Sequence, residues 1–152
     1  KSFGHIGDEH FTLGINGKNS EFHAAMGLAV LPYMQQNIAE RKMLSETYDE
    51  ALKGLPITRP KLPEGLEYNY AYYPVLFENE QTLLKVVEKL KKNEIIPRRY
   101  FWPSLNRLPY IEGQKCHKSE ITASRILCLP FFNSFNVNYV ALISNIIEAS
   151  IA

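Results

Sequence analysis

Cysteine is scarce in this chain of 152 residues, which has only Cys116 and Cys128. The two lie too far apart in sequence for a C-x-x-C metal or redox motif. Two thiols also fall short of the cysteine density that small secreted proteins use as a disulfide framework. We therefore expect both thiols to be reduced and the protein to be cytoplasmic.

An excess of charge of either sign is also missing, because the formal net charge is only +1. A near-neutral chain lacks the basic footprint of a nucleic-acid-binding protein. No apolar run approaches the ~20 residues that a membrane span needs, and Lys1–His5 lacks the features of a signal peptide. The hydrophobic content of 45% suits a folded core, so we expect one domain with neither nucleic acid nor membrane as partner.

Complete catalytic motifs are absent too. The sequence contains no G-x-S-x-G, H-E-x-x-H, Walker-type or G-x-G-x-x-G motif, so no catalytic residue is assigned. His5, Asp8, Glu9 and His10 lie close together, but their spacing fits no standard ligand motif and favours a solvated loop. We expect no metal site.

What the sequence does contain is a glycine-bracketed turn that leads into a helix, between Leu13 and Leu31 (L-G-I-N-G-K-N-S-E-F-H-A-A-M-G-L-A-V-L). Asn16 and Lys18 precede the first helical residues. An amide and an ammonium next to free helix N–H groups could bind a phosphate. The same pattern is also typical of an ordinary turn before a packed helix.

Periodicity predicts an α+β fold. The sum of the elements is a two-layer sandwich, in which helices cover one face of a small mixed or antiparallel sheet. The first helices are too long for so small a sheet, so we expect them to contact a surface outside the chain. The segments are a loop at 1–19, helices at 20–33, 36–52, 80–92, 119–128 and 138–151, strands at 68–77 and 95–102, and an extended piece at 129–132.

A second informative segment runs from Pro97 to Tyr110 (P-R-R-Y-F-W-P-S-L-N-R-L-P-Y), where arginines alternate with aromatic residues. Arginine binds phosphates in a forked geometry, and aromatic faces stack on bases or sugars, so the segment could bind a nucleotide. It could equally be a strand end whose aromatics fill the core while its arginines reach solvent.

These two segments resemble the DegT/DnrJ/EryC1/StrS aminotransferases, which use pyridoxal phosphate (PLP). The first matches G-x-N-x-(R/K)-x-S-E-x-x-A-A-x-G-L-x-x-L. Further matches follow in the family's order at A-E-R-K, Y-A-Y-Y-P-V-L-F, R-R-Y-F-W-P-S-L-N and A-S-R-I-L-C-L-P, so the resemblance covers nearly the whole chain.

The resemblance implies the C-terminal small domain of a fold type I aminotransferase, at 20–152, with 1–19 entering from a large domain that is missing. The lysine that binds the cofactor is missing with it, so we expect the isolated chain to be inactive. The intact enzyme would be a cytoplasmic homodimer that uses glutamate to aminate a nucleotide-linked keto-deoxy sugar, for example in lipopolysaccharide or O-antigen biosynthesis. The alternative is a non-catalytic dimerisation or partner-binding module that keeps the small-domain fold.

The resemblance also implies site residues. Asn16 matches the asparagine that reaches the cofactor phosphate of the neighbouring subunit, and Lys18 matches the basic position after it. Tyr100 lies where the family contacts the nucleotide sugar, and Arg99 beside it adds a phosphate-binding group. Phe101 and Leu105 replace residues that many members have as tyrosine and histidine, so neither is assigned a role.

Overall fold

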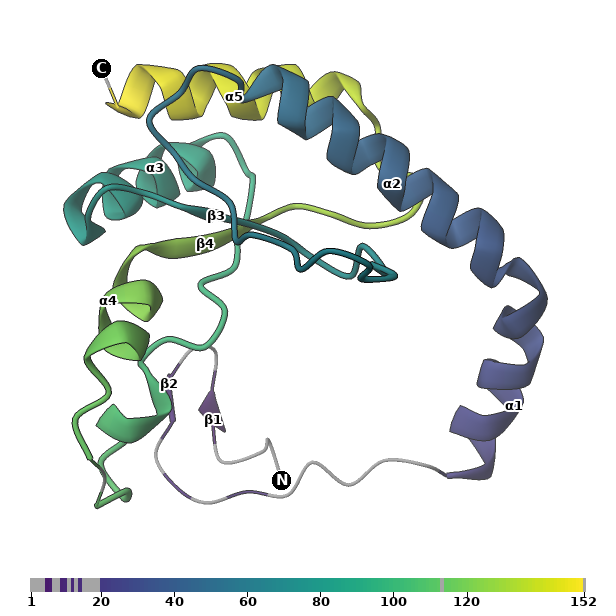
Figure 1. Ribbon diagram of the computed structural model, residues 1–152, viewed down its shortest axis with the longest axis horizontal. Coiled ribbons are helices and arrows are strands. Elements are labelled where there is room, and N and C mark those ends of the chain that lie inside the picture. The colour runs from purple at the N-terminus through teal and green to yellow at the C-terminus, as the bar shows by residue number, and fades with distance from the viewer. Residues whose placement is uncertain are drawn as a thin grey trace.

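The computed structural model describes residues 5–6, 9–10, 12, 14, 20–112 and 114–151. It consists of helices packed on a small antiparallel sheet (Figure 1). In chain order the elements are β1 (His5–Ile6), β2 (Glu9–His10), α1 (Glu21–Val30), η1 (Leu31–Tyr33), α2 (Met34–Ala51), β3 (Tyr73–Leu76), α3 (Glu80–Lys92), η2 (Leu105–Arg107), α4 (His117–Arg125), β4 (Ile126–Leu129) and α5 (Asn138–Ile151).

The central sheet is formed by β3 and β4, which pair antiparallel from Tyr73 opposite Leu129 to Leu76 opposite Ile126. Single bridges extend both edges, one from Thr58 to Leu76 and one from Arg98 to Cys128. The predicted antiparallel sheet is therefore confirmed, but it is narrower than expected, since the predicted strand at 68–77 pairs with β4 only over 73–76.

The predicted strand at 95–102 is wrong, because its only pairing with β4 is the bridge at Arg98. On one side, Pro130, which lies two positions after Cys128 and would pair with Ile96, has no N–H with which to continue the ladder. On the other side, Phe101 has a φ of 58°, which turns the backbone away from the extended conformation. The segment is therefore a short edge contact followed by a turn.

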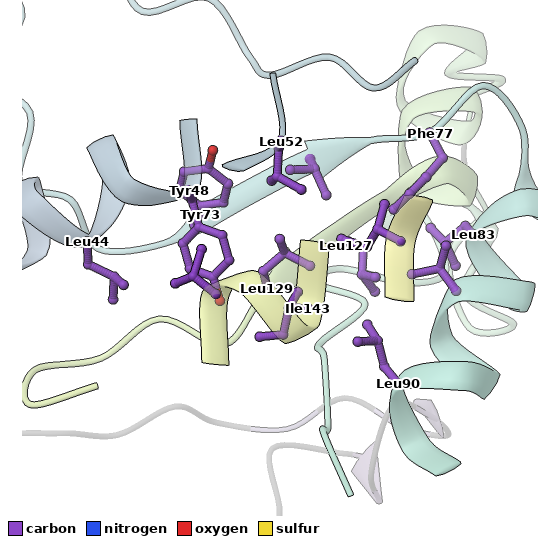
Figure 2. Close-up of a cluster of buried hydrophobic side chains, with 14 residues drawn as sticks. Leu44, Tyr48, Leu52, Tyr73, Phe77, Leu83, Leu90, Leu127, Leu129 and Ile143 are labelled. Carbon is purple, nitrogen blue, oxygen red and sulfur yellow. The ribbon is translucent and has the colours of Figure 1, made fainter. Parts of the chain in front are cut away.

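The hydrophobic core lies on one face of the sheet. Tyr73, Leu127 and Leu129 point from β3 and β4 toward the helices (Figure 2), and Val75 belongs to the same buried cluster. The rings of Tyr48 on α2 and Tyr73 stack with centroids 4.7 Å apart. Helix α5 packs against both α2 and α3, which closes this face. The predicted two-layer arrangement of helices on one face of a small sheet is confirmed.

Helices α3 and α5 have the predicted bounds, 80–92 and 138–151. The Asn79 side chain caps α3 by accepting a hydrogen bond of 2.9 Å from the backbone N–H of Thr82. Leu83, Val86 and Leu90 form its buried stripe. A cap and a strict apolar period are local signals, so the sequence predicts this helix well.

The predicted helix at 119–128 is wrong at its C-terminal end. Helix α4 ends at Arg125, and the apolar residues of Ile126–Leu129 form β4 directly after it. The extended piece predicted at 129–132 therefore begins three residues earlier, at Ile126. Leu127, Cys128 and Leu129 are buried because β4 lies between β3 on one side and the bridge from Arg98 on the other.

A second difference from the sequence prediction is the short antiparallel pair of β1 and β2, which lies within the segment expected as a loop at 1–19.

The predicted helix at 20–33 is α1 followed by the 3-10 turn η1, with Pro32 in its first turn, and α2 begins at Met34 rather than at 36. The Ser20 side chain caps α1 together with His23. No residue of α1 is buried, and Phe22 and Leu28 are 86% and 72% exposed. Figure 1 shows α1 beyond the end of α2, away from the core.

Candidate functional site

The face of the sheet opposite the core is built around the bridge between Arg98 and Cys128. Their backbones exchange two hydrogen bonds, of 3.0 and 2.8 Å. Residues directly opposite each other in an antiparallel pair project to the same face. Pro74 pairs with Cys128 from the other side, so Arg98, Cys128 and Pro74 share the face opposite the core helices, where Arg98 is exposed and Cys128 is buried.

A cluster of aromatic side chains lies at the end of this face. The Tyr72 hydroxyl donates a hydrogen bond of 3.0 Å to the Tyr100 hydroxyl. The Arg98 guanidinium lies over the Tyr100 ring, 4.4 Å from its centroid, and the Phe101 ring meets Tyr100 edge-on at 4.4 Å. Phe101 is 65% exposed. We call Tyr72, Arg98, Tyr100 and Phe101 the tyrosine cluster.

The chemistry of the tyrosine cluster is that of binding rather than of proton transfer. The hydrogen bond that Tyr72 donates to Tyr100 raises the pKa of Tyr72, so this phenol loses its proton less readily than an ordinary tyrosine. Burial raises the pKa of the nearby Cys128 thiol to about 11, which makes it a poor nucleophile. What the cluster offers a ligand is aromatic faces, phenol hydroxyls and one exposed cation.

Arg99 points away from the tyrosine cluster. Its Nη2 donates to Glu80 at 2.8 Å and to the Ser124 carbonyl at 3.2 Å, and its guanidinium stacks on the Trp102 ring at 3.8 Å. The side chain is only 13% exposed. Arg99 and Tyr100 are predicted to share one site, but the structure gives them different neighbours.

The segment after Trp102 is fixed to α4 by a polar network. The Ser104 hydroxyl donates to Asn106 at 2.7 Å, and the Asn106 amide donates to the Glu120 carboxylate at 2.7 Å. This hydrogen bond from Asn106 is the main reason that the pKa of Glu120 is lowered. The serine and asparagine of the R-R-Y-F-W-P-S-L-N segment therefore have structural contacts, while the Leu105 side chain between them is exposed.

The predicted cofactor residues Asn16 and Lys18 lie outside the described residues. The cap of α1 that follows them, formed by Ser20 and His23, is described and solvent-exposed. Within the described part of the chain, no group of three or more His, Cys, Asp or Glu side chains could hold a metal ion. No helix there is both long and apolar enough to cross a membrane.

Of the cluster residues, sequence analysis assigned a role only to Tyr100. It left Phe101 without a role, included Arg98 only among the arginines of the segment 97–110, and missed Tyr72. The alternation of Tyr72 and Tyr73 along a strand indicates that they face opposite sides, but only the register of β3 with β4 tells which side is the core.

A separate apolar hollow of about 470 Å³ is lined by residues such as Ile96, Phe132 and Tyr139, and none of the cluster residues lines it.

The family model of the DegT/DnrJ/EryC1/StrS aminotransferases matches residues 2–148. The chain belongs to this family. A curated relative from Escherichia coli, dTDP-4-amino-4,6-dideoxy-D-glucose transaminase, is 34% identical over 97% of this chain. The chain spans 42% of the length of that relative.

Two solved structures have a fold similar to that of this chain. DesI, solved with its TDP-sugar product, is 26% identical over 90% of this chain and 36% of its own, with a TM-score of 0.77. NtdA from Bacillus subtilis, solved with bound PMP, is 22% identical over 93% of this chain and 34% of its own, with a TM-score of 0.73. The predicted relation to the C-terminal part of the DegT/DnrJ/EryC1/StrS aminotransferases is confirmed at the level of family and fold.

Proposed function

We propose that this chain is the C-terminal part of a PLP-dependent aminotransferase that moves an amino group from glutamate to a nucleotide-linked keto-deoxy sugar. The family match over 2–148 supports this proposal most directly. The E. coli relative and DesI support the sugar-nucleotide class, because their names refer to a dTDP-linked amino sugar and a TDP-sugar. The share of the relative that this chain spans supports a longer intact polypeptide.

The proposed cofactor residues are Asn16 and Lys18. When bound, PLP supplies the electron sink that makes amino transfer feasible. A carboxamide and an ammonium ahead of a helix N-terminus are donors that suit the cofactor's phosphate dianion. In the proposed homodimer, these two side chains bind the phosphate of the cofactor that the partner subunit carries.

The proposed substrate surface is the tyrosine cluster. The Phe101 ring is exposed and the Tyr100 ring is half-buried, so the two together offer an aromatic surface on which a base or sugar can stack, and the exposed Arg98 can pair with a diphosphate. Direct contact of Arg99 with substrate stays an untested prediction. Since its guanidinium is already engaged by Glu80 and Ser124, we propose Arg98 as the cation that meets the ligand.

We further propose that the enzyme acts in the cytoplasm, where the sugar would enter lipopolysaccharide or O-antigen biosynthesis. The two free cysteines suit a reducing compartment.

The test is turnover by the full-length polypeptide. Purified with PLP, it would be offered glutamate and a panel of dTDP- and UDP-linked keto sugars, with formation of the amino sugar followed by mass spectrometry. We expect at least one substrate to be aminated, and none when glutamate is omitted. A PLP-loaded protein that aminates no member of the panel would contradict the proposal, and a natural gene that lacks the upstream lysine would favour the non-catalytic module.

A further inference from the structure

We propose that Arg99 is a positioning residue. It holds in place the turn at 98–104, which carries Arg98, Tyr100 and Phe101 of the tyrosine cluster, and it does not itself contact the substrate. The kinetic part of this inference rests on the proposed function. The structural part rests on the contacts of the turn alone.

The first step is that Arg99 connects the turn to two rigid elements. Glu80, which accepts its hydrogen bond, is the first residue of α3, and α3 is anchored in the core by Leu83 and Val86. Ser124, whose carbonyl accepts from the same Nη2, lies in the last turn of α4. A nearly buried guanidinium that bonds to both elements holds the turn between them.

The second step is that the turn requires such support. Phe101 adopts a φ of 58°, a left-handed conformation that aromatic residues rarely adopt and that persists only where the surroundings impose it. The backbone bridge of Arg98 to Cys128 fixes the chain on one side, and the hydrogen bonds of Ser104 fix it on the other. Between these two anchors, the stack of Arg99 on Trp102 is the contact that spans Phe101.

The third step is that neighbouring side chains diverge. Arg98 lies over the Tyr100 ring on the open face, while Arg99 points toward α3 and α4. Arg99 therefore affects the position of Tyr100 through the backbone of the turn, and the two side chains do not share a ligand site. Removing Arg99 should disorder the cluster without removing any of its side chains.

The chain offers a matched control in Arg59. Its guanidinium pairs with Asp49 and stacks on the Tyr73 ring at 3.9 Å, as Arg99 pairs with Glu80 and stacks on Trp102. Both arginines also have a buried Nε without a hydrogen-bond partner among the described residues. Arg59, however, contacts the Tyr73 side of the sheet and none of the cluster residues.

The experiment compares Arg99→Met, Arg99→Lys and Arg59→Met in the full-length protein. We expect Arg99→Met to raise the KM for the nucleotide sugar about tenfold, with kcat and the KM for glutamate within about twofold of wild type. Arg99→Lys keeps the charge but not the fork or the planar stack, so its KM should be intermediate. Arg59→Met should lower the melting temperature with the KM unchanged.

Hydrogen–deuterium exchange of peptides that cover 98–104 provides a readout that does not depend on activity. We expect faster exchange there in Arg99→Met and not in Arg59→Met. A raised KM without faster exchange would mean direct substrate contact by Arg99 and would overturn the inference, as would an unchanged KM. If the wild type aminates nothing, the proposed function fails, and the exchange rates still decide whether Arg99 orders the turn.

Discussion

At the scale of single residues, the direction of a side chain decides its role, and two neighbouring residues of the same type can have different roles. Arg98 and Arg99 are neighbours of the same type, yet one lies on the Tyr100 ring in solvent and the other is almost enclosed between α3 and α4. Residue type predicts phosphate binding for both. Only the bridge at Cys128 decides which one reaches the open face.

Replacing Tyr100 tests the open face directly. In the full-length enzyme we expect Tyr100→Ala to weaken nucleotide-sugar binding by about 1–3 kcal/mol, because the base or sugar loses its stacking surface. The KM for the sugar nucleotide, measured at saturating glutamate, reports this loss. Tyr139→Ala is the control, since Tyr139 is an exposed tyrosine on α5 outside the cluster. Equal KM values for both variants would remove Tyr100 from the site.

Asn16 provides the corresponding test for the cofactor. We expect Asn16→Ala to weaken PLP retention by about 1.5–3 kcal/mol, the range for a hydrogen bond to a charged group. The visible absorbance of the full-length enzyme after dialysis measures the cofactor that remains bound. Retention equal to that of the wild type would show that the amide does not reach the phosphate.

At the scale of elements, helices with local signals are predictable and strands with long-range partners are not. The bounds of α3 follow from its Asn79 cap and its apolar spacing, and those of α5 follow from its apolar spacing. The strands β3 and β4 are about fifty residues apart in sequence, and their pairing determines where each begins and ends. Before that pairing is known, I-L-C-L at 126–129 continues the apolar pattern of the preceding helix, which explains the error at 119–128.

The same contrast between local signals and long-range contacts applies to the candidate site. Tyr100 and Arg98 lie in a segment that the sequence singles out for its arginines and aromatics. Tyr72 comes from a different segment and contacts Tyr100 through a hydrogen bond and through its ring, with centroids 4.8 Å apart; no local sequence pattern predicts that contact. The part of the site that lies within one segment is therefore predictable, and the part that the sheet register assembles is not.

The N-terminal cap of α3 leads to a prediction about the free energy of unfolding. We expect Asn79→Ala to lower the free energy of unfolding by about 0.5–2 kcal/mol, because the N–H of Thr82 loses its acceptor. Urea unfolding followed by circular dichroism measures the change. Gln81→Ala, at an exposed position in the same first turn, is the control and should shift the midpoint little. A similar loss in both variants would mean that the cap adds nothing specific.

At the scale of the whole molecule, α1 stands apart from the rest. It carries apolar residues such as Phe22, Met26 and Leu28, all exposed, and it extends beyond the core (Figure 1). An exposed apolar surface of this kind normally marks an interface. The sequence predicts that the first helix contacts a surface outside the chain, and the exposure of every α1 residue supports that prediction.

The state of the 152-residue chain in solution tests this surface. We expect it to form concentration-dependent oligomers, measured by light scattering after size-exclusion chromatography, because no residue of the apolar side of α1 is buried against the described part of the chain. Phe22→Asp with Leu28→Asp should shift the population toward monomer. Leu84→Asp, on the exposed side of α3, is the control for added charge. Monomers at every concentration in the unmodified chain would contradict the prediction.

The late position of β4 has a consequence for biosynthesis. Until the ribosome has made the residues from Ile126 onward, Tyr73 and Val75 have neither the β4 strand nor the α5 side chains that enclose them in the finished structure. A nonsense mutation between the codons for Leu76 and Ile126 would therefore release a polypeptide in which β3 has no partner strand. Such a product should be cleared by proteases rather than accumulate as a shortened protein.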